Sequence, residues 1–307
     1  MHVSTGPLIA GLVVGLVVGM TGSGGGALLT PALILFLHVK AKTAVASDLV
    51  ATLFMRPTAA TVHLRRKTVH WEIVQWLVVG SVPAAFVSGW VAHYAITTSQ
   101  NKTVLEPLVG VALLLSGAAA VARRVARAKA QAAEEAAGDA LSDRRVLGQA
   151  EMTSARKVAC LLIGLIGGAV VGFTSVGSGT LMLVALGFTF PLLAPSELVG
   201  TDLVQAVPLV GAAALGHLLG GDLKLALTTS IIVGGVPGAL VGALISRSIP
   251  QVPLGLIVAG VIFGSGLALV GWGRWDIVVP VAALFLGALW MWRRRGALPV
   301  EPVGAAR

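Results

Sequence analysis

Two clusters of small residues interrupt apolar stretches of this chain and are candidates for an anion-binding site. They consist of Ser23, Gly24, Gly25 and Gly26 in one half of the chain, and of Ser175, Gly177, Ser178 and Gly179 in the other. Glycine lets the backbone turn tightly and lets a ligand approach it closely. A helix that starts after such a break points free N–H groups and the positive end of its dipole at whatever lies there. Two such helix starts facing one site would favour an anion, whereas the alternative is close helix packing through small residues.

Arg56 lies near the middle of an apolar segment that runs from about residue 43 to 64. An arginine at this depth in a bilayer costs about 2.5–3.5 kcal/mol on insertion scales, so it faces a partner or a watery site. Asp48 is about two helical turns away, roughly 12 Å along the axis, which is too far for an easy ion pair. Because the planar fork of arginine suits two oxyanion oxygens, we predict that Arg56 contacts an anionic substrate close to the glycine break at 22–26.

Two aspartates and two histidines are candidates for gating or for proton transfer. Asp48 and Asp202 each follow a hydroxyl residue near the start of an apolar segment, and His63 and His217 lie near the ends of the same segments. For the aspartates the alternative is helix capping, in which a side-chain oxygen accepts a backbone N–H bond. For the histidines the alternative is an ordinary interfacial side chain with no part in transport.

The composition predicts an all-α polytopic membrane protein. Of the 307 residues, 56% are hydrophobic and only 11% are charged, with a mean hydropathy of +0.91. A soluble domain carries about 25% charged residues, and the alternating short strands of a membrane β-barrel do not occur. The net charge of +9 comes from basic residues between apolar runs, where they set topology, so no nucleic-acid partner is expected. Cys160 is the only cysteine and lies in an apolar run, so we expect a packing role, no disulfide, no metal site and no cofactor.

The chain divides into apolar segments, most of which approach the about 20 residues that a membrane crossing needs. They are predicted at 6–22, 25–38, 43–64, 71–94, 103–122, 157–173, 178–193, 198–219, 224–246, 252–271 and 276–292. The two short segments, 25–38 and 178–193, each follow a glycine break and are predicted to be half-helices or re-entrant pieces. The resulting units are a first transmembrane repeat (6–122), a cytoplasmic connector (123–156), a second transmembrane repeat (157–271) and a final transmembrane helix (276–292).

The basic residues predict the orientation of the chain in its membrane. Lys and Arg gather at Arg65–Lys67, in the connector and at Arg293–Arg295. Because loops rich in these residues stay in the cytoplasm, the N-terminus is predicted outside and the C-terminus inside.

The two halves of the chain repeat each other. VVGMTGSGGGALLTPAL (17–33) aligns with VVGFTSVGSGTLMLVAL (170–186). Further along, Asp48 aligns with Asp202, His63 with His217 and Pro83 with Pro237. One repeat begins outside and the other inside, so we predict inverted-topology repeats. Inverted repeats with broken helices are an architecture of secondary transporters, which bind substrate near the midplane.

These motifs resemble the TauE/SafE family, also called the sulfite exporter or toluene sulfonate uptake family. The resemblance is carried by GLVVGMTGSGGGALLTPAL and its degenerate copy GGAVVGFTSVGSGTLMLVAL, by ASDLV and GTDLV, and by GSVPAA and GGVPGA. It covers roughly residues 7–292 and implies a bacterial inner-membrane transporter of small sulfur-containing anions such as sulfite, sulfonates or thiosulfate. In the second copy, Val176, Ser178 and Thr180 replace small or glycine positions, so we expect two half-sites that are not equivalent.

Other functions and the direction of transport follow from simple arguments. A zinc protease would need H-E-x-x-H, which is absent, and neither Ser23 nor Ser178 fits the G-x-S-G motif of an intramembrane serine protease. A purely structural scaffold would leave the mid-membrane Arg56 unexplained. One charge that crosses 100 mV is worth about 2.3 kcal/mol, so a dianion leaves a negative interior without a coupling ion. The sequence therefore favours export of a small sulfur-containing anion, with proton-coupled uptake of a related organic anion as the alternative.

Overall fold

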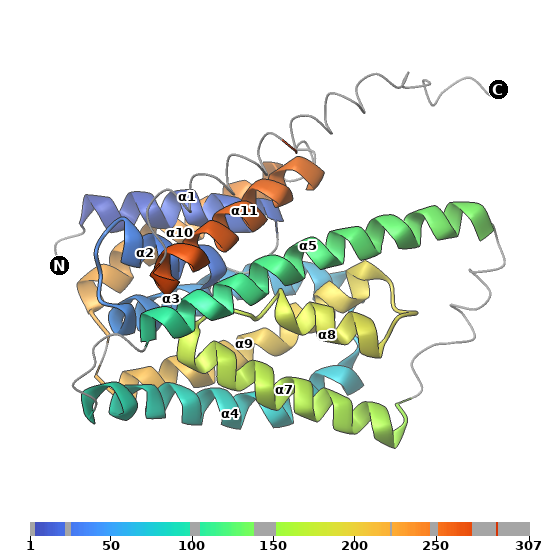
Figure 1. Cartoon of the computed structure of the whole chain (residues 1–307), viewed down its shortest axis with the longest axis horizontal. Helices are drawn as coiled ribbons and strands as arrows, with labels where there is room; N and C mark the ends of the chain where they lie inside the picture. Colours follow the sequence, from blue (N-terminus) through green and yellow to red (C-terminus); the bar gives the residue numbers. More distant parts are fainter. Residues whose placement is uncertain are drawn as a thin grey trace.

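The computed structural model describes residues 4–21, 26–98, 105–137, 152–221, 223–245, 251–271 and Gly287. Within these ranges the regular elements are helices, which confirms the all-α prediction. They are α1 (Thr5–Thr21), α2 (Gly26–Leu35), α3 (Ala41–Arg65), α4 (Trp71–Thr98), α5 (Leu105–Ala137), α7 (Ser154–Thr174), α8 (Leu181–Thr189), α9 (Pro195–Leu219), α10 (Leu225–Ile245) and α11 (Gln251–Val270) (Figure 1).

Five helices in the described part of the chain are long and apolar enough to cross a membrane, which confirms a polytopic membrane protein. They lie at Trp71–Ala92, Leu105–Ala122, Ser154–Thr174, Ser196–Leu219 and Leu225–Gly242. α2 and α8 are short, as the sequence predicts for segments that follow glycine breaks. α5 continues as a helix to Ala137, well beyond the predicted span. Residues 138–151 of the predicted connector, and the predicted final helix at 276–292 except Gly287, lie outside the described residues.

The packing contacts of α1–α5 in the first repeat match those of the corresponding helices α7–α11 in the second repeat. α1 packs against α10 just as α7 packs against α4, and α3 contacts α10 just as α9 contacts α4. The pairs α3–α9 and α5–α11 are each made of two matching helices (Figure 1). This match is what a two-fold relation between the repeats requires. Whether the axis lies in the membrane plane, as inverted topology needs, stays a prediction.

Small residues allow the two long helix pairs to approach closely. A Cβ atom added to Gly11 of α1 would lie 2.5 Å from the carbonyl oxygen of Ile231 in α10. A Cβ atom added to Gly164 of α7 would lie the same 2.5 Å from the carbonyl oxygen of Leu77 in α4. The repeat in the sequence thus produces the same backbone approach twice, in the manner of helix pairs that associate through small residues in lipid.

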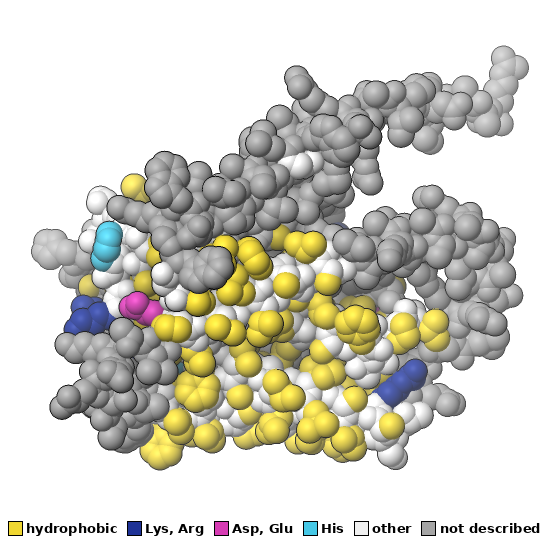
Figure 2. All heavy atoms as spheres, in the orientation of Figure 1, with side chains coloured by type: hydrophobic (Ala, Val, Ile, Leu, Met, Phe, Trp, Pro, Cys, Tyr) yellow, Lys and Arg dark blue, Asp and Glu magenta, His cyan; other side chains and the backbone are white. Residues whose placement is uncertain are grey.

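The apolar side chains form both a core and an outer belt. Leu29, Leu33 and Leu49 of α2 and α3 are fully buried in the centre. Figure 2 shows hydrophobic side chains spread across the outward face of α4 and α7, where Val79 and Ile166 are exposed. An apolar outer face is what a helix in lipid presents. On the inner side of the same pair of helices, Cys160 is buried among Ile73, Leu77, Leu186 and Phe190, which confirms its packing role.

Candidate functional site

The second glycine break separates α7 from α8 as predicted. Residues 175–180 are not helical. Ser175 ends α7 in the left-handed conformation with a φ of 59°, and Gly177 and Gly179 have φ values of 111° and 88°. Glycine adopts such values without the steric penalty that a Cβ atom imposes, so the two glycines are what allow this segment to turn. Ser23, Gly24 and Gly25 of the first break lie outside the described residues.

The start of α2 lies directly against the second break. Gly26 is the first residue of α2, and a Cβ atom there would collide with the carbonyl oxygen of Ser175. Only glycine permits this approach. The beginning of one short helix and the break before the other short helix therefore meet in the interior, where the sequence predicts a shared site.

The start of α8 does not present all of its N–H groups to a ligand. The backbone N–H groups of Thr180, Leu181 and Met182 all point at the carbonyl oxygen of Gly177, with N···O distances of 3.3, 3.0 and 3.4 Å. The prediction of free N–H groups is wrong for these three, because the turn at Gly177 directs its carbonyl group back toward the helix start. Donors for an anion at this break must therefore include side chains.

Arg56 reaches the second break from α3. Its side chain is 4% exposed, and its Nη2 atom donates a hydrogen bond to Ser178 Oγ. Its Nε and Nη1 atoms are buried and have no hydrogen-bond partner in the described part of the chain. The hydroxyl group of Thr180, two residues after Ser178, is likewise buried without a partner. The sequence predicts that Arg56 lies near the break at 22–26, whereas its described partner belongs to the break in the other repeat.

Asp48 is surrounded by hydroxyl groups. Its carboxylate is fully buried and accepts hydrogen bonds from Thr30 (2.5 Å), Thr52 (3.0 Å) and Ser175 (2.9 Å). The capping alternative is wrong here, because α3 begins at Ala41 and the carboxylate binds side chains from α2, α3 and the second break. Thr52 could have been found from the sequence, since residues one turn apart lie on the same helix face. Thr30 and Ser175 come from other segments and carried no such signal.

Asp202 has a different neighbour. It is buried on α9 and accepts a hydrogen bond from Gln205 Nε2 at 3.3 Å. Gln205 Oε1 in turn accepts a bond from Ser81 at 3.3 Å. Capping is wrong for Asp202 as well, because α9 begins at Pro195. Sequence reasoning did not identify Gln205, although it lies one turn after Asp202 on the same helix face.

One buried cation and two buried carboxylates therefore share the interior. Arg56 lies within electrostatic reach of both Asp202 and Asp48. Its described hydrogen bond goes to Ser178. Arg56 is thus held close to negative charge, while Nε and Nη1 have no hydrogen-bond partner among the described residues.

The two aligned histidines occupy different environments. His217 of α9 is 1% exposed, and its Nε2 atom lies 2.8 Å from the carbonyl oxygen of Gly172 in α7. His63 is half-buried at the end of α3, where its Nδ1 atom lies 2.9 Å from Thr68 Oγ1. The symmetry of the sequence therefore does not extend to the hydrogen bonds of these two rings.

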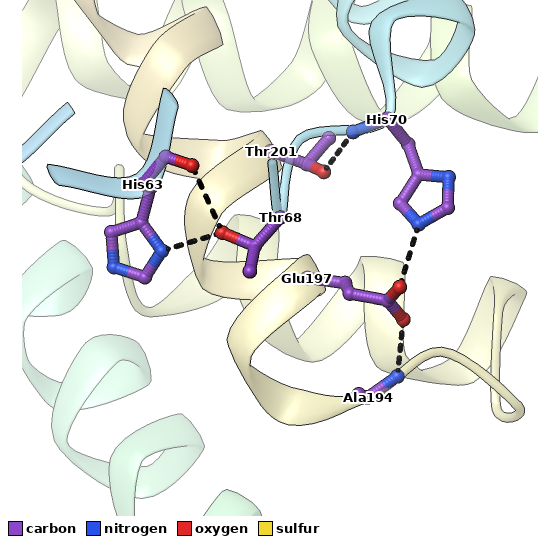
Figure 3. A network of polar contacts seen from close by, with 6 residues as sticks. All are labelled: His63, Thr68, His70, Ala194, Glu197 and Thr201. Atoms are coloured by element: carbon purple, nitrogen blue, oxygen red, sulfur yellow. Dashed lines mark hydrogen bonds and ion pairs between the residues drawn. The ribbon is translucent and has the colours of Figure 1, made fainter. Parts of the chain in front are cut away.

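A polar network ties the loop between α3 and α4 to the start of α9 (Figure 3). His70 Nε2 lies 3.2 Å from Glu197 Oε1, and the backbone N–H of His70 donates to Thr201 Oγ1 at 3.1 Å. Glu197 Oε2 also accepts the backbone N–H of Ala194 at 2.8 Å. We call this contact between the repeats the His70 clasp. It joins the two repeats at one end of the bundle.

A comparison with known protein families assigns this chain to one of them. The family model described as "Sulfite exporter TauE/SafE" matches residues 8–269, which include both short helices and all the candidate residues above. The chain belongs to the TauE/SafE family. This finding confirms the resemblance seen in the sequence and identifies the chain as a member of a family of membrane transporters.

Relatives of this TauE/SafE protein occur in Bacillus subtilis (strain 168). The chain is 32% identical over 264 residues to "Probable membrane transporter protein YjnA", which covers 86% of this chain and 98% of that protein. It is 23% identical over 240 residues to "Probable membrane transporter protein YdhB", which covers 78% of this chain and 89% of that protein. No solved structure matches the chain significantly.

Proposed function

We propose that this TauE/SafE protein exports a small sulfur-containing oxyanion, such as sulfite or an organosulfonate, across a bacterial inner membrane. The observation that carries the proposal is Arg56, which is buried, donates to Ser178, and has no hydrogen-bond partner for Nε and Nη1 among the described residues. A buried guanidinium with unused donors is costly in hydrocarbon. An oxyanion supplies the missing acceptors, and hydrogen bonds between charged partners are about twice as strong as neutral ones.

The surroundings of Arg56 support an anion rather than a cation or an apolar ligand. The hydroxyl groups of Ser178 and Thr180 lie at the same break, and a hydroxyl group can donate to an oxyanion. α8 begins at this break, so the positive end of its dipole lies beside the proposed site although three of its N–H groups are already bonded. We include Gly177 and Gly179 because their conformations shape the break, and the predicted Ser23–Gly26 cluster because Gly26 contacts it.

The family and the relatives support a transport role rather than an enzymatic one. The relatives' names denote membrane transporters, and the family description names a sulfite exporter. We favour export because the membrane potential alone drives a dianion out of the cell. Asp48, Asp202, His63 and His217 are proposed as gating or proton-linked residues. The proposed orientation has the N-terminus outside and the C-terminus in the cytoplasm.

Efflux from liposomes tests the proposal. Purified protein is reconstituted into vesicles loaded with sulfite or methanesulfonate, and efflux is followed under a potassium diffusion potential that is negative inside. We expect efflux from vesicles with the wild type and its loss in Arg56→Ala. The matched control is Arg66→Ala, which removes an exposed guanidinium from the loop after α3. Undiminished efflux in a well-folded Arg56→Ala sample would refute the proposed site, and peptide cleavage without flux would favour an enzyme.

A further inference from the structure

We propose that Asp48 takes up a proton when an anion binds at Arg56. This inference rests on the proposed anion site and adds a linked protonation to it. In the balanced step, the anion and a proton from the adjoining solution enter together, and the Asp48 carboxylate becomes a carboxylic acid. No other bond is made or broken.

The hydrogen bonds of Asp48 fit both of its protonation states. Its described partners are the hydroxyl groups of Thr30, Thr52 and Ser175. A hydroxyl group is both a donor and an acceptor. All three donate when Asp48 is ionised, and one of them can rotate to accept the carboxyl proton when Asp48 is neutral. Asp48 therefore keeps a hydrogen-bond partner in both protonation states.

Asp202 has a different polar environment. Its carboxylate accepts a bond from Gln205 Nε2 at 3.3 Å, and Gln205 Oε1 accepts a bond from the Ser81 hydroxyl at 3.3 Å. A hydrogen bond from an amide donor favours the ionised carboxylate. We therefore assign the proton uptake to Asp48, and the Asp48→Asn variant tests this assignment.

Charge balance provides the driving force for proton uptake. The described interior holds the guanidinium of Arg56 and the carboxyl groups of Asp48 and Asp202. A bound monovalent anion adds one negative charge beside two carboxylates, and a nearby like charge disfavours ionisation. If Asp48 takes up a proton, the total buried charge is the same before and after the anion enters.

The two sites are close enough to affect each other. Asp48 binds Ser175 and Arg56 binds Ser178, so both side chains contact one short segment. Three residues span at most about 10 Å. At that separation and an effective dielectric constant of about 20, two charges change each other's binding constants on the order of tenfold. By linkage, a proton on Asp48 strengthens anion binding by the same factor.

Few other described charged groups face Asp48. α2 and α10 carry no charged side chain, and the break at 175–180 carries none. α9 contributes Asp202 and His217, and the nearest charged residue of α5, Glu106, is exposed. On α3 itself the neighbouring charged residues are Lys42 and Arg56. Of the groups that titrate near neutral pH, His217 of α9 and His63 of α3 are the described alternative carriers, and a variant at Asp48 separates them from Asp48.

Calorimetry on the purified full-length protein tests the coupling. The probe is methanesulfonate, which keeps its charge at neutral pH, whereas sulfite takes up protons itself. Binding is measured across a pH series in two buffers of different ionisation enthalpy, which gives the number of protons taken up. We expect a fractional uptake of protons that is largest near the titration of Asp48, together with an affinity that falls about tenfold in total as the pH rises through that range. Asp48→Asn should bind with an affinity that is independent of pH.

The controls separate failure of the coupling from failure of the anion site. Glu106→Gln removes an exposed carboxyl group and should keep the wild-type pH dependence. Binding that needs Arg56 but takes up no proton would overturn the coupling and leave the anion site intact. Proton uptake that persists in Asp48→Asn would overturn the assignment to Asp48. If neither methanesulfonate nor sulfite binds the wild type, the proposed site and the coupling both fail. Should Asp48→Asn not fold, the proton count of the wild type still decides whether a proton is taken up, and loss of that uptake in His217→Gln or His63→Gln would overturn the assignment to Asp48.

Discussion

Asp48 and Asp202 occupy matching positions in the two repeats, yet they have different partners. Asp48 accepts bonds from three hydroxyl groups, whereas Asp202 accepts a bond from the amide of Gln205. The helices around them match, because α3 contacts α9 and each contacts the long helix of the other repeat. The comparison teaches that the duplicated sequence reproduces the backbone packing while the side chains at its centre have diverged.

The same divergence between the repeats explains why the buried arginine of the described site comes from one repeat. Arg56 of α3 aligns with Val210 of α9, and both side chains are buried. Val210 adds no charge at this position, so the described interior holds the cation of Arg56 beside the two carboxylates of Asp48 and Asp202. The two repeats therefore act together on one site, to which α3 contributes the charge and the second break contributes Ser178.

The largest effect should come from the point where the two short helices meet. Gly26→Ala places a methyl group against the carbonyl oxygen of Ser175, a backbone atom that cannot rotate away. Overpacking of this kind costs about 1–3 kcal/mol or more, so we expect a clear fall in the melting temperature in detergent, together with loss of anion binding. The control is Gly187→Ala in α8, where a Cβ atom meets nothing within 4 Å. Equal stability of the two variants would show that the helices do not meet as described.

The second-largest effect should come from Arg56→Lys, which tests the difference between Arg56 of α3 and the aligned Val210 of α9. Arg56→Lys keeps the charge but loses the planar fork of arginine. In the wild type this fork binds Ser178 through Nη2, and its other two nitrogen atoms, which have no described partner, could bind an oxyanion. Hydrogen bonds to charged groups contribute about 1.5–3 kcal/mol, so we expect methanesulfonate affinity to fall about tenfold or more while the protein stays folded. Val210→Thr, a polar change at the aligned position, should leave affinity within about threefold. An undiminished affinity in Arg56→Lys would reduce the role of Arg56 to a point charge.

The sequence predicted the framework better than the contacts. The helix bounds follow the apolar runs closely because length and hydrophobicity decide them in a membrane. Gly177 and Gly179 marked the second break because few other residues adopt its backbone angles. The partner of Arg56 was not predictable, since Ser178 is distant in sequence and the spacing within α3 carries no information about it. The bonded N–H groups at the start of α8 depend on one carbonyl orientation, which composition does not encode.

A smaller effect should separate the hydroxyl groups that bind Asp48 from other buried hydroxyl groups. Thr52→Val removes a hydrogen bond of 3.0 Å to the carboxylate at nearly constant volume. We expect a loss of about 1.5–3 kcal/mol in unfolding free energy if Asp48 is ionised, and a smaller loss at a pH where Asp48 is protonated. Ser116→Ala removes a buried hydroxyl group that has no hydrogen-bond partner in the described structure, so stability should be unchanged or improved. A loss in Thr52→Val that does not vary with pH would contradict titration of Asp48.

The smallest effect should come from the ends of the bundle, which are held differently in the two repeats. At one end the His70 clasp joins half-exposed groups, whereas at the other the Thr228 hydroxyl donates to the buried Ser47 at 3.0 Å. Half-exposed ion pairs contribute about 0.2–1 kcal/mol because solvent screens them. A double-mutant cycle with His70→Ala and Glu197→Ala, measured as unfolding free energy in detergent, should give a coupling in that range. Added salt should reduce it, since the screening length falls with ionic strength. Thr228→Val should lose stability independently of salt, because both hydroxyl groups are buried and uncharged. A coupling between His70 and Glu197 that does not change with salt would mean that the His70 clasp is a packed contact. Uncharged contacts would then hold both ends of the bundle.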